Sequence, residues 1–153
     1  MTTAIRMTIQ ANGEMIVGEG VSDGDRGFVE CLSYTDGITT DQAPTGHSLG
    51  RRHHEPIVIR KRIDGTSPLL LSALSKSQQV EARWRFFRPG PNLGALQHYF
   101  TVEATGGRIV HIGRSWETGE HEEHEEVAIA QLAIVWTHEP SGTSFESRPR
   151  GVV

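Results

Sequence analysis

The segment of residues 51–74, RRHHEPIVIRKRIDGTSPLLLSAL, constrains the fold most, because it places a strand directly before a helix. Successive side chains in its first half alternate between two faces, which is the period-two pattern of a strand with one drier face. One face carries Ile57, Ile59, Lys61 and Ile63, and the other carries Val58, Arg60 and Arg62. The pair Asp64-Gly65 then ends the predicted strand.

A short helix is predicted over residues 67–77, because its first residues suit a helix N-terminus. Ser67 can cap the first turn with its hydroxyl group. Pro68 fits the first helical position, since a backbone N–H there would have no intrahelical partner. Leu70 and Leu74 lie four residues apart and form one apolar stripe.

Strand patterns occupy most of the remaining chain. The dipeptide Asn12-Gly13 suits the positive dihedral angles of a tight turn and predicts a hairpin between residues 5–9 and 15–17. Residues 28–34 form a second predicted strand, and residues 80–86 a third.

Two further turns complete the predicted β pattern. A hairpin about Thr105, Gly106 and Gly107 is expected to join strands at residues 96–102 and 108–112. A turn at residues 140–142 precedes a last strand around Phe145. The whole pattern favours a mainly β fold, a small antiparallel β-barrel or two-sheet sandwich with one short α-helix.

Two segments depart from simple alternation. Residues 35–53, TDGITTDQAPTGHSLGRRH, show no periodicity and many turn-forming residues, so a long loop is predicted there. Residues 127–137 are apolar on both faces, which predicts one strand covered on two sides.

Length and composition limit the organisation of the chain. A chain of 153 residues suits one domain, so residues 1–153 are expected to form a single unit. No segment reaches the ~20 apolar residues of a membrane span, and membrane insertion is not expected. The first residues, MTTAIRMTIQANGE, lack the apolar core of a secretory signal, which favours cytoplasmic synthesis without a signal peptide. The lone Cys31 is predicted to be a small buried or edge side chain.

Several function classes find no support in the sequence. The net charge of −4 and the pI near 6.0 argue against a nucleic-acid partner, which needs a basic surface. Trp84 and Phe86 share one strand face and are predicted to be core residues rather than a base-stacking platform. No glycine pattern of a nucleotide-binding loop is present, and no nucleophile lies in a recognisable motif. Neither a cofactor nor an enzymatic activity is therefore expected.

The acidic, histidine-containing run at residues 119–126, GEHEEHEE, is the strongest candidate for metal chemistry. His121 and His124 lie three residues apart among carboxylates, whereas a zinc peptidase helix needs imidazoles four apart. The run is therefore interpreted as a solvated loop that enters the following strand. A metal-dependent enzyme built on His121 and His124 is the alternative.

The segment that begins at His54 resembles the haemolysin-coregulated protein family, Hcp, which forms the tube of bacterial type VI secretion systems. In order and spacing the likeness runs from about residue 47 to residue 149, and includes ARWRFF, YFTV and AIAQLAIVW. Its signature reads H-x-P, four residues, then K-x-x-D-x-x-S-P-L-L, and is carried by His54, Pro56, Lys61, Asp64, Ser67, Pro68, Leu69 and Leu70.

The resemblance implies a structural role rather than catalysis. Copies of the chain are expected to form a homohexameric ring, and rings to stack into a tube inside a contractile sheath. The tube would leave the cell with its tip (spike) proteins and would hold effector proteins in its lumen. His54 is expected to be a structural residue at a strand entrance.

Stacking requires a set of contacts along the tube axis, in addition to the contacts that close the ring. The long, polar loop is the candidate for these contacts, through Thr39, Thr40, Asp41, Thr45, His47, Arg51 and Arg52. A tail tube protein of a contractile phage or phage-like particle is a related alternative. The sequence Ser67-Pro68-Leu69 favours the secretion family.

Overall fold

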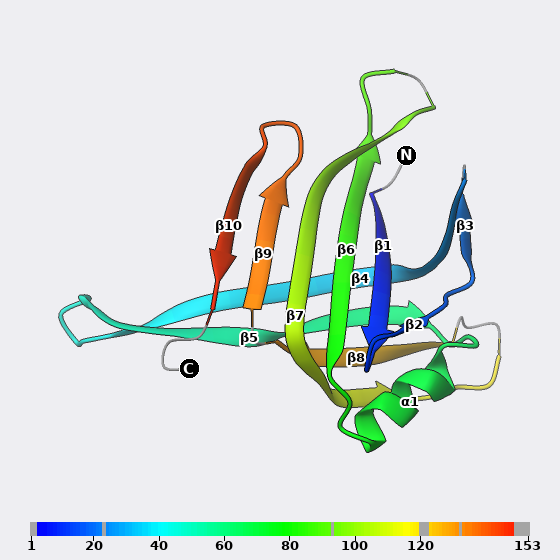
Figure 1. The fold of residues 1–153 in the computed structure, drawn as a ribbon, viewed down its shortest axis with the longest axis horizontal. Helices are drawn as coiled ribbons and strands as arrows, with labels where there is room; N and C mark the ends of the chain where they lie inside the picture. Colours follow the sequence, from blue (N-terminus) through cyan, green and yellow to red (C-terminus); the bar gives the residue numbers. More distant parts are fainter. Residues whose placement is uncertain (1–2, 23, 93, 120–122, 132, 149–153) are drawn as a thin grey trace.

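The structure is a computed structural model that describes residues 3–22, 24–92, 94–119, 123–131 and 133–148. It is mainly β, with one short helix, as the sequence predicted (Figure 1). The elements are β1 (Ala4–Ala11), β2 (Glu14–Ile16), β3 (Gly20–Ser22), β4 (Asp25–Gln42), β5 (Ser48–Arg62), α1 (Ser67–Ser75), β6 (Val80–Pro89), β7 (Leu96–Arg114), β8 (His124–Ala130), β9 (Ala133–His138) and β10 (Thr143–Ser147).

All strand pairs are antiparallel, and six of the strands close on themselves. The strand order is β10-β9-β7-β6-β1-β4-β5-β8, and β8 also pairs with β7. The circuit from β7 through β6, β1, β4, β5 and β8 back to β7 is therefore a closed barrel, which confirms the predicted barrel. Strands β9 and β10 extend the sheet beyond β7, and β2 and β3 lie off this path, against β1 and β4.

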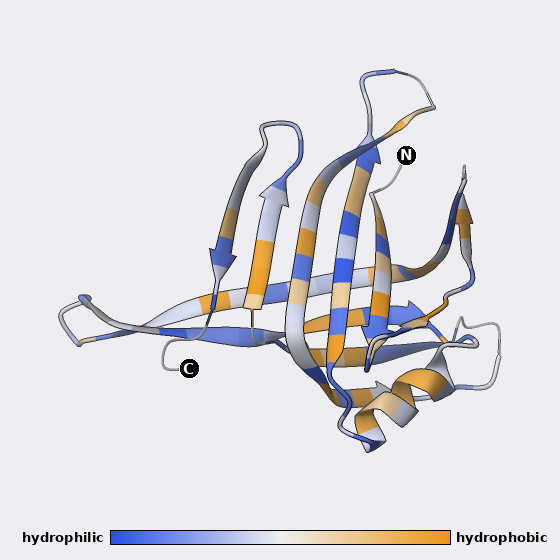
Figure 2. Cartoon of the chain, viewed as in Figure 1, coloured by the Kyte–Doolittle hydropathy of each residue, from blue (hydrophilic) through white to orange (hydrophobic). Residues whose placement is uncertain are grey.

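The barrel interior is filled by alternating residues of each strand, and Figure 2 shows this alternation of hydrophilic and hydrophobic positions along β6. Trp84 is fully buried and Phe86 is nearly so, which confirms both as core residues. Leu70 of α1 is also fully buried, with Leu74 packed against the core as predicted. Cys31 is buried, in agreement with the sequence.

The predicted hairpin about residues 105–107 is wrong, because β7 runs unbroken from Leu96 to Arg114. Its first part pairs with β6 and β9, and its second part with β8. Gly106 has φ 67°, and a side chain at Gly107 would lie 2.6 Å from the carbonyl oxygen of Ala130. The two glycines therefore let the strand bend between two partners instead of reversing.

The predicted single strand over residues 127–137 is also wrong, because this segment forms two strands. β8 ends at Ala130 and pairs with β5 and β7, whereas β9 begins at Ala133 and pairs with β7 and β10. The apolar character on both faces remains true of β8, in which Val127, Ala128 and Ile129 are all buried.

The predicted long loop at residues 35–53 is instead a continuation of β4 and β5. These strands stay paired out to Gln42 and Ser48, and Ala43 and His47 close a short turn between them. Residues 37–56 thus form a two-stranded hairpin, the arm, that extends sideways beyond the barrel and past β10 (Figure 1). No helix of the described chain is long and apolar enough to span a membrane.

Candidate functional site

The Lys61 side chain lies at the centre of the site, inside the barrel wall. The alternation of β5 turns Lys61 to the same side as Ile57 and Ile59, and all three are fully buried. In the sheet, Lys61 lies opposite Glu125 of β8, and Glu125 also lies opposite Arg114 of β7. Two strand ladders therefore bring a buried carboxylate between two cations.

The Lys61 ammonium group donates to four oxygen acceptors. Its Nζ lies 2.7 Å from Oε2 of Glu125, 3.1 Å from Oδ1 of Asp64 and 3.3 Å from Oγ of Ser67. It also donates to the backbone carbonyl of Arg62 at 2.8 Å. A buried ammonium group is costly unless its charge is paired and its protons are bonded, and both conditions hold here.

Glu125 is equally well bonded. Its Oε1 accepts from Nη2 of Arg114 at 2.6 Å, and its Oε2 accepts from Lys61 and from the Ser67 hydroxyl. Burial alone would raise the pKa of Glu125, but the bonds from Lys61, Ser67 and Arg114 outweigh burial and hold the pKa below its ordinary value.

Asp64 connects this cluster to the start of α1. Its Oδ1 accepts from the backbone N–H of Thr66 at 2.9 Å and from the Thr66 hydroxyl at 2.6 Å. Burial raises the pKa of Asp64, yet the bonds from Thr66 and Lys61 lower it further, so the pKa lies below its ordinary value. We call Lys61, Asp64, Ser67, Arg114 and Glu125 the ion cluster.

The predicted helix cap at Ser67 is wrong in detail. The cap position is Thr66, without a side-chain capping bond, and Ser67 is the first helical residue. The Ser67 hydroxyl accepts from the backbone N–H of Asp64 at 3.1 Å and donates to Glu125. Ser67 is already inside the helix, and its hydroxyl oxygen accepts from the Asp64 N–H and from Lys61 Nζ, so it does not accept from the N–H groups of the first helical turn.

The remaining signature residues lie around the cluster rather than in it. His54 lies inside β5 and not at the strand entrance, and its Nε2 is 2.8 Å from Oγ of Ser147 in β10. Pro56 is exposed at an irregularity of the β4–β5 ladder, where its missing N–H costs little. In α1, Leu70 is fully buried but Leu69 is 50% exposed.

The candidate stacking residues all belong to the arm. Thr39, Thr40 and Asp41 lie on β4, and Arg51 and Arg52 on β5. Thr45 and His47 are exposed at the tip. The arm also holds an exposed pair between Asp41 and His53, with 2.8 Å between Oδ1 and Nε2.

The acidic run does not behave as the predicted solvated loop throughout. Glu125 is buried in the ion cluster, and His124 and Glu126 belong to β8. Nε2 of His124 lies 2.8 Å from the Arg60 guanidinium group. His121 lies outside the described residues, and within the described ranges no three metal-ligating side chains are grouped to hold an ion.

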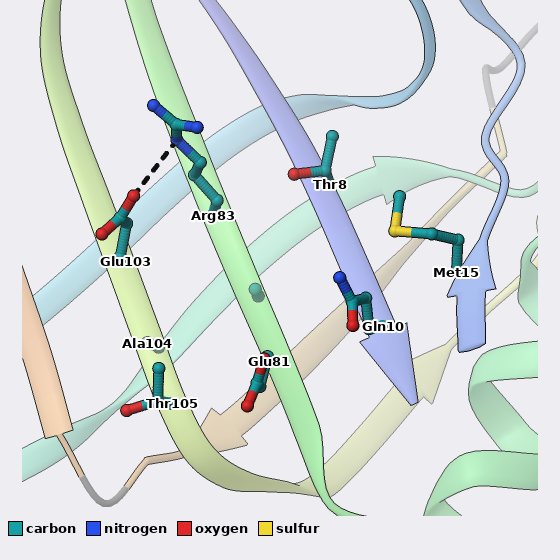
Figure 3. Close-up of a pocket in the computed structure, with 9 residues that line it drawn as sticks. Thr8, Gln10, Met15, Glu81, Arg83, Glu103, Ala104 and Thr105 are labelled. Carbon is teal, nitrogen blue, oxygen red and sulfur yellow. Dashed lines mark ion pairs between the residues drawn. The ribbon is translucent and has the colours of Figure 1, made fainter. Parts of the chain in front are cut away.

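A separate hollow of about 330 Å³ lies on the face of β1, β6 and β7 that points away from the core (Figure 3). Arg83 and Glu103 point toward each other across it, with 3.4 Å between Nε and Oε1, and both are about half exposed. Thr8, Gln10 and Thr105 supply further polar groups. The hollow is a shallow polar depression of the sheet surface.

Sequence reasoning identified Lys61, Asp64 and Ser67 but missed Glu125 and Arg114. The signal for Glu125 was present, because an inward lysine on an otherwise apolar strand face requires a buried carboxylate. Arg114 gave no comparable signal, since it lies at the end of a strand in a polar segment.

A family match connects the chain to type VI secretion, and a relative of known sequence is an exported protein. The family described as "Type VI secretion system effector, Hcp" matches residues 7–138. A protein of Pseudomonas aeruginosa named "Major exported protein" is 32% identical over 148 residues, which cover 90% of this chain and 84% of that protein.

Solved structures share the fold at lower sequence identity. A crystal structure of an Hcp protein superposes with a TM-score of 0.89 at 19% identity, over 99% of this chain and all of that one. The Hcp1 protein of E. coli EAEC 042 gives a TM-score of 0.85 at 20% identity, over 95% of this chain and 97% of that one. The family match agrees with the signature at residues 54–70.

Proposed function

The chain belongs to the Hcp family of the type VI secretion system, and from this premise we propose that six copies associate into a ring that stacks with other rings into a tube. Membership of this family places the chain among exported structural proteins of the secretion apparatus rather than among enzymes. In the proposal, residues 1–153 act together as one tube domain.

The arm is the observation that carries this proposal. Among the described residues, its strand ladder joins only β4 and β5, because β5 meets β8 from Ile57 onward. Contacts with the rest of the chain lie at its base, where Gln131 donates to the Glu55 carbonyl and His54 meets Ser147. An isolated two-stranded hairpin is at best marginally stable in water. An arm of this length therefore gains stability from a surface of another copy.

Within the tube, the arm is proposed to contact the neighbouring ring. Thr39, Thr40, Thr45 and His47 are exposed on its outer part, and they offer hydroxyl and imidazole groups for hydrogen bonds. Asp41 and Arg52 add charges of both signs, and Arg51 lies next to Arg52 on β5. Such polar contacts suit rings that assemble and separate more readily than a fully apolar interface would.

The remaining steps of the proposal follow from the family. The chain is made in the cytoplasm and leaves through the type VI apparatus. A contractile sheath surrounds the tube, spike proteins lie at its tip, and effector proteins travel in its lumen.

Electron microscopy and native mass spectrometry of the purified full chain test the ring. Annular particles with the mass of six subunits are expected. A monomer at high protein concentration would overturn the proposal.

A variant with a shortened arm tests the role of the arm separately from ring formation. Residues 40–52 are replaced by an Asn-Gly turn between Thr39 and His53, which are direct partners across the ladder. Single rings are expected to persist while stacks of rings disappear. If the rings themselves are lost, the arm acts within the ring, and if stacks persist, it has no axial role.

A further inference from the structure

A groove of about 310 Å³ crosses β5, β8 and β7, on the face of these strands opposite the buried Lys61 and Glu125, and Arg114 belongs to both the groove and the ion cluster. It lies apart from the arm and from the hollow of Figure 3. Its lining residues are Arg60, His111, Gly113, Arg114, Ser115, His124 and Glu126.

Strand geometry explains how these side chains meet. Arg60, His124 and Glu126 alternate with the buried Lys61 and Glu125, and therefore point outward. On β7, an irregularity between Ile109 and His111 changes the alternation and leaves His111 exposed.

Gly113 leaves room in the groove for the imidazole ring of His111. A side chain at Gly113 would lie 2.8 Å from Nε2 of His111, so the imidazole ring occupies the space that a larger residue would fill. Across the ladder, Gly113 lies opposite Glu126. Gly113 therefore contributes only backbone to the lining, beside the side chains of His111 and Glu126.

Arg60 is available to a ligand. Among the described residues it forms no ion pair, although Glu126 is its direct neighbour across the β5–β8 ladder. Instead its Nη2 lies 2.8 Å from Nε2 of His124. A neutral imidazole is a weaker partner for a guanidinium group than a carboxylate, which can accept two parallel bonds.

Two exposed apolar side chains flank the groove in sequence. Val110 precedes His111 and is 53% exposed, and Trp116 follows Ser115 and is 56% exposed. Tryptophan and arginine are the residue types that dominate binding energy at protein interfaces. An arginine without a carboxylate partner in the groove, and an exposed tryptophan that directly follows the lining residue Ser115 in the chain, together suit a protein partner.

We propose that this groove is a docking site for an acidic segment of a partner protein, in which Arg60 binds a carboxylate and Trp116 covers an adjoining apolar side chain. Charge complementarity is the reason for an acidic partner, because the Arg60 guanidinium group forms no ion pair among the described residues, and the imidazoles of His111 and His124 beside it can donate hydrogen bonds to a carboxylate. The proposal does not depend on ring formation.

The test uses a fluorescein-labelled tetraglutamate peptide, with tetraglutamine as the neutral control and anisotropy as the readout. Arg60→Gln is expected to weaken tetraglutamate binding about tenfold, the loss expected for one charge-assisted contact. Arg83→Gln removes the same charge from a half-exposed arginine outside the groove and is expected to bind normally.

Three results would overturn the proposal. Equal losses in Arg60→Gln and Arg83→Gln would indicate general attraction to a charged surface. Equal binding of tetraglutamine would exclude carboxylate recognition. Unchanged binding in both Arg60→Gln and Trp116→Ala would place the contact elsewhere. Native mass spectrometry of the same samples reports the oligomeric state, so a loss of peptide binding can be told apart from a loss of ring formation.

Discussion

The barrel wall and the arm are built from the same two strands, β4 and β5, but are stabilised in different ways. Inside the barrel, β5 is paired on both sides and buries Ile57, Ile59 and Lys61 completely. In the arm, each strand has one ladder partner, and the polar side chains Thr39, Thr40 and Thr45 are exposed. The wall is therefore fixed by strand pairing on both sides and by a buried core, whereas the arm is held mainly by the pairing of its own two strands.

The largest expected difference between the two regions comes from the ion cluster. Lys61→Met leaves Glu125 buried with less compensation, and is expected to lower the free energy of unfolding by about 3–5 kcal/mol. Arg83→Met, which breaks an exposed pair, is expected to cost at most about 1 kcal/mol. Urea unfolding followed by circular dichroism measures both, and similar values would contradict the role of the cluster.

Two glycines give a matched comparison of wall and arm. A side chain at Gly107 would meet the backbone carbonyl of Ala130 at 2.6 Å, whereas one at Gly37 would meet only the mobile end of the Glu55 side chain. Gly107→Ala is expected to cost about 1–3 kcal/mol, and Gly37→Ala less than about 0.5 kcal/mol. Equal costs in thermal or urea unfolding would show that β7 can shift at its bend.

A fall in pH is expected to lower the free energy of unfolding, because it protonates Glu125 and Asp64 of the ion cluster. The pKa values of Glu125 and Asp64 lie below their ordinary values of 4.5 and 3.8, so their contribution is complete above pH 4.5 and is lost as the pH falls through the folded-state values. Each carboxyl group changes the free energy of unfolding by at most about 1.4 kcal/mol per pH unit.

Urea unfolding at a series of pH values measures this loss. Glu125→Gln is expected to be less stable at neutral pH and to show a smaller further loss in acid. An identical acid response in the variant would mean that other carboxylates dominate.

The smallest expected effect concerns the root of the arm. Ser147→Ala removes the contact between β10 and His54, which is worth about 1 kcal/mol, so amide exchange in the arm should accelerate about fivefold. Ser144→Ala, at an exposed position of the same strand, is the control and should leave exchange unchanged. Equal exchange in both variants would show that the contact does not hold the arm.

The sequence predicted those strands that have one buried face and one exposed face. The Asn12-Gly13 hairpin, the inward positions of β5 and the core residues Trp84 and Phe86 were all confirmed, because alternation follows burial. The arm was missed for the same reason. Both of its faces are largely exposed, so its strands carry no period-two signal and resemble a loop.

Two further errors arose because a local sequence pattern has a different structural role from the one that it usually indicates. Gly106 and Gly107 resemble a turn, but they let one strand serve two neighbours. The run at residues 119–126 resembles a uniformly solvated acidic segment, yet Glu125 within it is buried. Tertiary pairing decides both cases, and local composition does not report it.

Cys31, the only cysteine of the chain, has a practical consequence. Burial raises the pKa of its thiol to about 12, so very little of the reactive thiolate exists at neutral pH. Maleimide reagents should therefore spare the unaltered protein. A new cysteine at the arm tip, such as Thr45→Cys, could then carry a fluorophore or cross-linker at one defined point without first removing the native thiol.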